Sequence, residues 1–236
     1  MRRAARAFLD LLYPPACPAC DTDIDGHAAL CAACEISLYP LGTACRVCGE
    51  PIAGPTPITC RRCVQEPPPF DSITAPFRYG GQLAIALQRL KYQRRPDIAR
   101  TLAPLLAPAL LDACTDSDVI VPIPLHWRRR STRGFNQATL LVEEAQWNSD
   151  IPIDTLSLCR TQPTAPQTGI NARDRAANVA GAFAVGARRA TRLAGKNVLL
   201  FDDVITTGAT VAEAARAVLG AGAATVRGLC LARAET

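Results

Sequence analysis

The sequence contains a run of acidic, hydroxyl and small residues between a predicted strand and a predicted helix. Residues Val198–Phe201 predict the end of a strand, Asp202 and Asp203 follow it, and Val211–Leu219 predict the helix. Free backbone N–H groups at the start of a helix, together with its dipole, favour an anion. We therefore predict a sugar-phosphate site, in which the two acids hold hydroxyls and the loop holds the phosphate. The loop residues are Thr206, Thr207, Gly208, Ala209 and Thr210.

Asp202 and Asp203 are expected to be exposed at the end of the strand, where they repel each other unless hydroxyls, a cation or basic groups meet them. Because they are expected to be exposed, they should contribute little to the stability of the core. An ordinary strand, loop and helix with a capping box is the alternative, since Thr210 and Glu213 have the T-x-x-E spacing. That alternative accounts for Thr210 and leaves the acid pair unexplained.

A loop rich in arginine is expected after another predicted strand, Asp118–Ile123. Ligands on parallel sheets bind at the carboxyl ends of the strands, so this cluster is expected near the acid pair. Arginine suits phosphate because its guanidinium is a planar, bidentate fork. We predict that the cluster grips a pyrophosphate, with a solvated basic turn as the alternative. Lys91 closes a predicted helix and is either a further phosphate contact or a solvated helix end. The arginines are Arg128, Arg129, Arg130 and Arg133.

Positive charge is concentrated in the part of the chain that carries these motifs. The formal charge is +5, of which residues 1–70 contribute −1 and residues 71–236 contribute +6. Such a balance suits phosphate-bearing ligands or nucleic acid. Residues 160–178 form a second polar segment that is long enough to act as a lid over a bound ligand. Its polar side chains include Arg160, Gln167, Arg173, Arg175 and Asn178.

Eight of the eleven cysteines form four C-x-x-C pairs with gaps of ten, ten and eleven residues between the pairs. Two such pairs complete a tetrahedral thiolate site, so four pairs predict two structural zinc ions. Neighbouring pairs are the first expectation for each site, and an interleaved arrangement stays open. A disulfide framework is the competing interpretation, and it requires an oxidising compartment. The predicted ligands are Cys17, Cys20, Cys31, Cys34, Cys45, Cys48, Cys60 and Cys63.

Four thiolates close the coordination shell of zinc, so these sites are expected to be structural rather than catalytic. Eight thiolates and two zinc ions lower the formal charge from +5 to +1, so nucleic-acid binding would rest on local patches. Because the thiolates complete both sites, His27 is not needed as a zinc ligand, and we expect it at the surface. The remaining cysteines are unpaired, and we expect Cys159 and Cys230 to lie in the core with no chemistry assigned to them or to Cys114.

The order of apolar segments predicts an α/β fold with a parallel sheet covered by helices on both faces. A stiff linker, Glu66–Phe70, places a boundary between a zinc module at 1–66 and a larger domain at 67–236. Expected strands are Ser72–Tyr79 at the edge, Asp118–Ile123, Leu156–Arg160, Ala182–Val185, Asn197–Phe201 and Thr225–Leu231. Expected helices are Gly81–Gln93, Asp97–Ala113 with interruption or bending at Pro104 and Pro108, Phe135–Trp147, Ala172–Ala177 and Val211–Leu219.

The hydrophobic content of 49% argues against disorder. No run of eighteen apolar residues is present, which excludes a membrane-spanning helix, and the first residues make a poor secretory signal. We therefore expect a cytoplasmic protein.

Together these motifs resemble the ComF (competence protein F) family, in which a double zinc ribbon precedes a type I phosphoribosyltransferase-like domain. Residues 198–210 are similar to the thirteen-residue fingerprint of type I phosphoribosyltransferases. The resemblance implies that Asp202 and Asp203 contact ribose hydroxyls and that Thr206–Thr210 wrap the 5′-phosphate of phosphoribosyl pyrophosphate, bound with Mg²⁺.

The resemblance also implies a role in handling single-stranded DNA during competence-type DNA uptake, beside DNA-uptake proteins at the inner membrane face. Two hypotheses follow. In the first, the protein binds the sugar diphosphate without chemistry; in the second, it is an active phosphoribosyltransferase with an unknown acceptor. A zinc module stands where a glutaminase domain would be needed, so glutamine-dependent amination is not expected.

Overall fold

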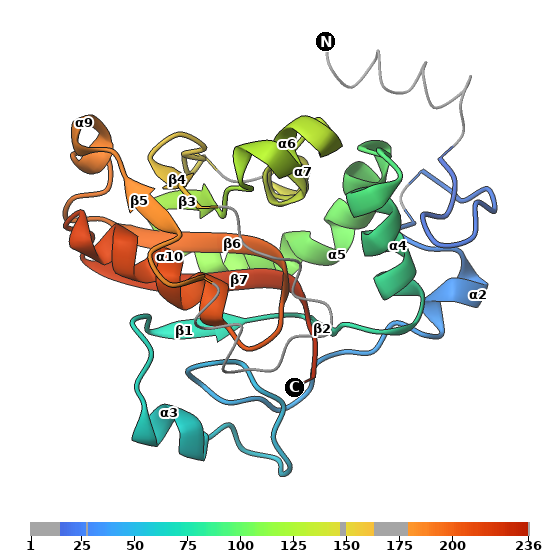
Figure 1. Ribbon diagram of the computed structural model, residues 1–236. Coiled ribbons are helices and arrows are strands. Elements are labelled where there is room, and N and C mark those ends of the chain that lie inside the picture. The colour runs from blue at the N-terminus through green and yellow to red at the C-terminus, as the bar shows by residue number, and fades with distance from the viewer. Residues whose placement is uncertain (1–14, 27, 147–149, 163–178, 236) are drawn as a thin grey trace.

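Four segments of the chain are described by the computed structural model, namely residues 15–26, 28–146, 150–162 and 179–235. A parallel sheet lies at its centre, with the strand order β1-β7-β6-β3 and with β2 pairing with β7 further along (Figure 1). The strands are β1 (Ser72–Thr74), β2 (Phe77–Arg78), β3 (Val119–Pro122), β6 (Asn197–Ile205) and β7 (Thr225–Arg233). The sequence prediction of a parallel α/β sheet is confirmed.

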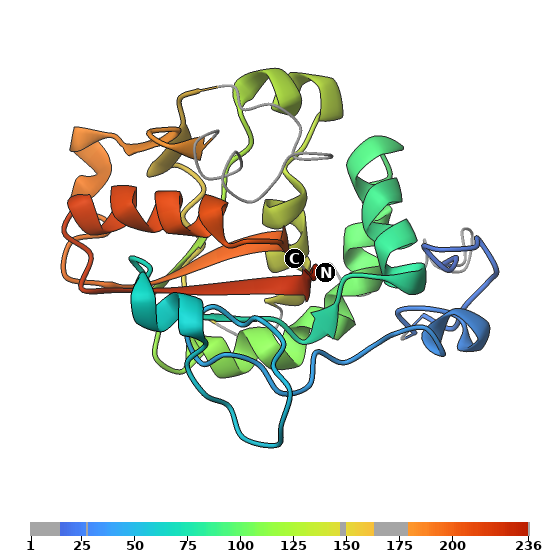
Figure 2. The ribbon, with the colours of Figure 1, turned by 60° about the horizontal axis from the view of Figure 1, so that its bottom comes forward.

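Alternate residues of β6 enter two separate hydrophobic cores, because successive side chains of a strand point to opposite faces. Leu199 and Phe201 pack with residues of α4, α5 and α7, whereas Val198 and Leu200 pack with residues of α10. Figure 2 shows α10 and α5 on opposite sides of the sheet. These helices are α4 (Gly81–Tyr92), α5 (Asp97–Cys114), α7 (Gln137–Ala145) and α10 (Ala209–Gly220).

Two cysteine-rich loops precede the sheet; the first packs against helix α4 and the second against strand β1. We call residues 17–34 the first ribbon and residues 45–63 the second ribbon; they contain or adjoin the short helices α2 (Ala32–Glu35) and α3 (Arg61–Gln65). The first ribbon contacts α4, where Arg89 donates to Asp21 at 2.8 Å. The second contacts β1, where the Ile73 N–H donates to the Val47 carbonyl at 2.7 Å. The domain boundary after Glu66 stays a prediction.

Several elements differ from expectation. Helix α5 continues through Pro104 and Pro108, both of which are exposed, so it is not interrupted there, and bending at the two prolines stays a prediction. The arginine cluster is not a loop, because it forms the helix α6 (Trp127–Arg133). The strands expected at 156–160 and 182–185 are not part of the parallel sheet. These segments form a separate antiparallel pair, which is followed by α9 (Ala187–Ala190). That pair is β4 (Leu158–Arg160) and β5 (Phe183–Val185).

Of the three cysteines outside the C-x-x-C pairs, Cys114 and Cys230 are buried, but Cys159 is exposed, contrary to expectation. Its side chain points away from the core because Leu158, its neighbour in β4, is the residue of this strand that is buried. The predicted helix Ala172–Ala177, His27 and most of the polar segment 160–178 lie outside the described residues. Within the described segments, no helix combines the length and the apolar character needed to cross a membrane.

Candidate ligand cavity and zinc sites

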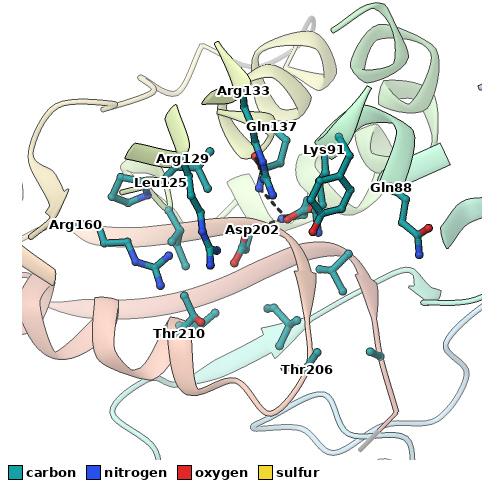
Figure 3. Close-up of a pocket in the computed structure, with 18 of the residues that line it drawn as sticks. Gln88, Lys91, Leu125, Arg129, Arg133, Gln137, Arg160, Asp202, Thr206 and Thr210 are labelled. Atoms are coloured by element: carbon teal, nitrogen blue, oxygen red, sulfur yellow. Dashed lines mark hydrogen bonds and ion pairs between the residues drawn. The ribbon is translucent and has the colours of Figure 1, made fainter. Parts of the chain in front are cut away.

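A cavity of about 1020 Å³ opens at the carboxyl ends of β3 and β6 (Figure 3). Its walls come from α4, α6, the loop after β6 and the start of α10. Ten of the twelve predicted acid, loop and cation residues line it. They are Lys91, Arg128, Arg129, Arg133, Asp202, Asp203, Thr206, Gly208, Ala209 and Thr210.

The two remaining residues, Thr207 and Arg130, are not part of the cavity lining. Thr207 shapes the loop instead, because its hydroxyl accepts a hydrogen bond from the Ala209 N–H at 3.4 Å. Arg130 is exposed on α6. The structure therefore brings the predicted acids and most of the predicted cations to a single site.

Asp203 is buried, contrary to the expectation that both acids are exposed, because β6 continues to Ile205 and carries the pair inside the sheet. Its Oδ2 lies 2.5 Å from the Lys91 Nζ, and its Oδ1 accepts from Gln137 at 3.5 Å. Lys91 is thus held in the cavity wall rather than solvated at the helix end. Burial would lower the pKa of Lys91, but the charge of Asp203 outweighs it, and the pKa lies above its ordinary value.

Asp202 is half-buried and faces the cavity between Arg129 and Lys91 (Figure 3). Burial, followed by the charge of Asp203, raises the pKa of Asp202 to about 8, although Lys91 opposes the change. The Asp203 N–H donates to the Asp202 Oδ1 at 2.9 Å. At neutral pH Asp202 therefore holds a proton much of the time, and an arriving cation would favour its release.

The loop between β6 and α10 ends in Gly208, which precedes the first residue of the helix in a left-handed conformation with φ of 82°. A methyl group added to Gly208 would lie 3.5 Å from the Ile73 Cδ1, so it would point into the protein interior rather than over the cavity. The capping-box alternative is wrong. Glu213 accepts instead from the Gly181 N–H at 2.6 Å and from Arg216 at 2.6 Å.

Arginines form the wall opposite the loop. Arg128 lies over the Trp127 ring at 5.3 Å, and Arg133 lies over the Tyr92 ring at 5.0 Å. Burial, and then the charge of Arg133, lower the pKa of Arg129 from its ordinary value. Crowded cations of this kind favour an anion between them.

Several cavity residues were given no role by sequence reasoning. Arg94 and Gln137 line the cavity, as does Tyr79. Arg94 follows α4 and donates to the Thr132 carbonyl at the end of α6, at 2.8 Å, so it joins two walls of the cavity. These residues lie in segments that are distant in the sequence from the acid pair, and no local pattern marks them.

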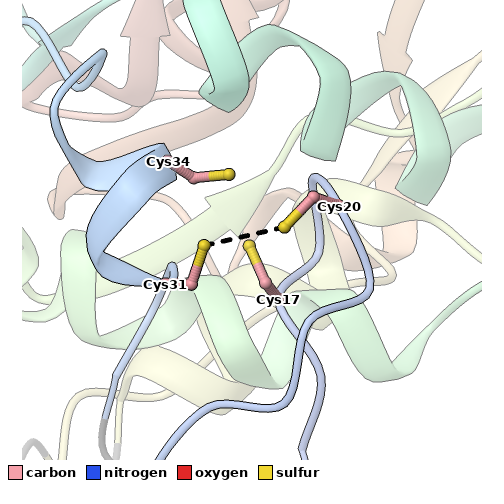
Figure 4. Close-up of side chains that lie close together, drawn as sticks. All are labelled: Cys17, Cys20, Cys31 and Cys34. Atoms are coloured by element: carbon pink, nitrogen blue, oxygen red, sulfur yellow. Dashed lines mark hydrogen bonds between the residues drawn. The ribbon is translucent and has the colours of Figure 1, made fainter.

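The eight paired cysteines form two groups of four, Cys17–Cys34 and Cys45–Cys63, in which all sulfur atoms lie within 4.8 Å of one another. Neighbouring pairs therefore share a site, as first expected, and the arrangement is not interleaved. The sulfurs of Cys20 and Cys31 are 3.6 Å apart (Figure 4). Those of Cys48 and Cys60 are 3.7 Å apart. Tetrahedral zinc with bonds of about 2.3 Å separates sulfurs by about 3.8 Å, so both groups fit zinc.

Comparison with known proteins agrees with this two-part organisation. The double zinc ribbon domain family matches residues 8–64, and the phosphoribosyl transferase domain family matches residues 97–236. A protein of Escherichia coli O157:H7 named "DNA utilization protein YhgH" is 36% identical, over 88% of this chain and 92% of that protein. "Competence protein F" of Haemophilus influenzae is 33% identical, over 87% and 90% of the two chains. The chain belongs to the ComF family.

A more distant ComF relative is "Competence protein ComFC" of Bacillus subtilis, which is 28% identical over 83% of this chain and 80% of its own length.

In this ComF chain the segment between the two matched domains, residues 65–96, supplies part of the site. It carries β1 and α4, and therefore both Lys91 and Ile73. The cavity of this family member is thus assembled from the transferase-type domain and from the segment that joins it to the ribbons.

Proposed function

We propose that the cavity binds phosphoribosyl pyrophosphate together with Mg²⁺. The observation that carries the proposal is that one cavity holds an acid pair, a helix N-terminus and an arginine wall. Asp202 would hold the ribose hydroxyls, and the loop Thr206–Thr210 would hold the 5′-phosphate. The arginines of α6 then face the pyrophosphate, whose remaining charge Mg²⁺ would neutralise.

We further propose that the protein handles single-stranded DNA. Its relatives are named for competence and for DNA utilization. Six cations and two acids line the cavity among the described residues, as does the exposed Tyr92, and the exposed ring of Trp127 lies 5.3 Å from the guanidinium of the lining residue Arg128. Cationic grooves with exposed aromatic rings bind single strands by backbone attraction and base stacking. The cations are Lys91, Arg94, Arg128, Arg129, Arg133 and Arg160.

The assignment of the arginine wall is tested by thermal unfolding with ligand. Phosphoribosyl pyrophosphate with Mg²⁺ should raise the melting temperature more than ribose 5-phosphate, because only the former offers a pyrophosphate. The triple change Arg128→Ala, Arg129→Ala and Arg133→Ala should remove this difference. A control that removes equal charge elsewhere is Arg188→Ala, Arg192→Ala and Lys196→Ala, and it should keep the difference. Equal shifts for both ligands in the unchanged protein would refute the assignment.

Transfer of the phosphoribosyl group to an acceptor is the second candidate function. The size of the cavity favours it, because about 1020 Å³ lies at the upper end of the range of ligand pockets and leaves room for a second reactant. Asp202 would then steady the positive charge that develops on the ribose. Pyrophosphate release, measured with and without single-stranded DNA and candidate acceptors, separates this function from binding alone.

A further inference from the structure

The second ribbon lies directly against the strand that supports the phosphate loop. Val47 stands between two of its cysteines, and its carbonyl accepts the Ile73 N–H of β1 at 2.7 Å. Gly49 has φ of 68°, and a methyl group added to it would lie 2.7 Å from the Ile73 carbonyl oxygen. Backbone therefore packs on backbone at this seam, with no room for a side chain at Gly49.

The Ile73 side chain continues this contact from the ribbon to the loop. It is 2% exposed, and its Cδ1 lies 3.5 Å from the position of a methyl group on Gly208. Its Cγ1 lies 3.0 Å from the corresponding position on Gly228 of β7. Ile73 thus fills the space beneath two glycines, one of which starts the helix of the phosphate loop.

A partly buried ion pair joins the same ribbon to the same end of the sheet. Arg233 of β7 is fully buried and lies 2.6 Å from the Glu50 carboxylate. Arg233 is paired in register with Ile205, the last residue before the loop. Glu50 is fixed by the ribbon, because its carbonyl accepts the Cys45 N–H at 2.8 Å. A buried guanidinium that loses its carboxylate partner is costly, so displacement of the ribbon would disturb the strands beside the loop.

We propose that zinc in the second ribbon and phosphate on the Thr206–Thr210 loop stabilise each other's binding through Ile73. The inference rests on the proposed binding of a sugar phosphate at that loop. Without metal, the second ribbon has a core of little more than its own cysteines, and its loop geometry depends on the ion. Because coupling between two sites is reciprocal, bound ligand must raise the affinity of the second ribbon for zinc by the same factor by which zinc raises the affinity for the ligand.

The first ribbon provides an internal comparison. It touches the cavity wall by way of Asp21, which is 51% exposed and pairs with Arg89 and Arg95 of the α4–α5 region. Exposed ion pairs contribute little free energy. Ligand binding should therefore affect the zinc of the first ribbon much less than that of the second.

The test follows alkylation of each cysteine in the full-length, zinc-loaded protein. A maleimide and a zinc-selective chelator are added, with Mg²⁺ alone or with Mg²⁺ and saturating phosphoribosyl pyrophosphate, and peptides are analysed by mass spectrometry. Cys45, Cys48, Cys60 and Cys63 should react about fivefold or more slowly with the sugar diphosphate. The four cysteines of the first ribbon should change by less than about twofold.

Calorimetry on the same sample distinguishes a failure of the coupling between zinc and ligand from a failure of the proposed ligand binding. Measured binding with unchanged alkylation at the second ribbon overturns the coupling and leaves the proposed function standing. Measured binding with equal slowing at both ribbons overturns the route through Ile73. No measured binding and no slowing overturn the proposed function, and the coupling with it.

The substitution Ile73→Val tests the route with little disturbance, because it removes the Cδ1 that lies under Gly208 and keeps the backbone bond to Val47. The slowing of alkylation should fall by at least about half at saturating ligand. Ile120→Val shortens another fully buried isoleucine of the same sheet, in β3, and should leave the slowing unchanged. Full slowing in the Ile73→Val protein would contradict the proposed role of this side chain.

Discussion

Asp202 and Asp203 are neighbours in the chain but have different surroundings and hence different roles. Asp203 is buried and held by Lys91 and Gln137, so it fixes the geometry of the wall. Asp202 faces the cavity and has a pKa of about 8, raised first by burial and then by Asp203. A group that titrates near neutrality can donate or accept a hydrogen bond, which suits contact with hydroxyls and with a cation.

The raised pKa of Asp202 predicts how stability depends on pH. Its folded-state value of about 8 exceeds the ordinary value of 3.8, so ionisation is easier in the unfolded chain. The contribution of Asp202 to the unfolding free energy is fully present below pH 3.8 and is lost as the pH rises through 8. Compared with Asp202→Asn, the unchanged protein should lose stability between these values, by at most about 1.4 kcal/mol per pH unit. Urea unfolding of both proteins at several pH values measures this, and parallel curves would contradict it.

The Lys91–Asp203 pair predicts a large effect of removing one partner. Lys91→Met leaves the buried carboxylate without its cation and should cost about 3 kcal/mol of unfolding free energy. The double change Lys91→Met with Asp203→Asn should restore much of this loss. The earlier expectation that the acid pair contributes little to stability assumed that both acids are exposed, and that premise is wrong for Asp203, which is buried. A loss below about 0.5 kcal/mol in urea unfolding of Lys91→Met would show that the pair is worth no more than a surface one.

At the scale of the elements, the described part of the cavity is formed by helices, by strand ends and by the short loop after β6. Helix α10 begins at the phosphate loop, α6 presents the arginines, and α4 presents Lys91. The hydrogen bond from Arg94 to Thr132 holds α4 and α6 in a fixed relation across the cavity. A change in the packing behind one wall should therefore alter ligand affinity.

Gly208→Val tests this idea at the phosphate loop. The new side chain would press on Ile73 and would impose a disfavoured left-handed conformation on valine, so the loop should move and affinity for the sugar diphosphate should fall about tenfold or more. Gly195→Val is the matched control, because Gly195 has φ of 70° and open space around it, far from the cavity. Calorimetry should find unchanged affinity in the control. Equal losses in the two variants would attribute the effect to global strain.

How much of this arrangement the sequence predicts depends on how local each feature is. The apolar run before Asp202, the loop and α10 are contiguous, so a short stretch of residues determines them. The partner of Asp203 could not be predicted, because Lys91 belongs to a distant helix and only the fold joins the two. Helix α6 was missed because none of its residues is buried, which leaves no apolar periodicity to detect. The pairing of β4 with β5 was also missed, because strand partners are chosen by tertiary contacts.

At the scale of the whole molecule, positive charge is local rather than general. With both ribbons loaded with zinc the formal charge is only +1, yet six cations meet at one cavity. The second ribbon supports the sheet behind that cavity, while the first contacts α4. Binding of nucleic acid should therefore depend on the cavity rim rather than on the net charge of the chain.

Single-stranded DNA should bind weakly, with an affinity that falls steeply as salt increases. The triple change Arg128→Ala, Arg129→Ala and Arg133→Ala should weaken binding for all sequences and reduce the slope of log affinity against log salt by about 2. Fluorescence anisotropy over a salt series measures both. Unaltered binding in this variant would indicate that DNA binds at the ribbons rather than at the cavity.

Calorimetric titration of phosphoribosyl pyrophosphate with Mg²⁺ into the zinc-loaded, full-length protein tests the central claim most directly. We expect saturable binding at one site per chain, weaker binding of ribose 5-phosphate, and loss of binding in Asp202→Ala, which removes the carboxylate that faces the cavity but spares Asp203. At a ligand concentration a hundred times the dissociation constant, this binding adds about 2.7 kcal/mol to the unfolding free energy. Absence of measurable binding to the folded, zinc-loaded protein would contradict the account.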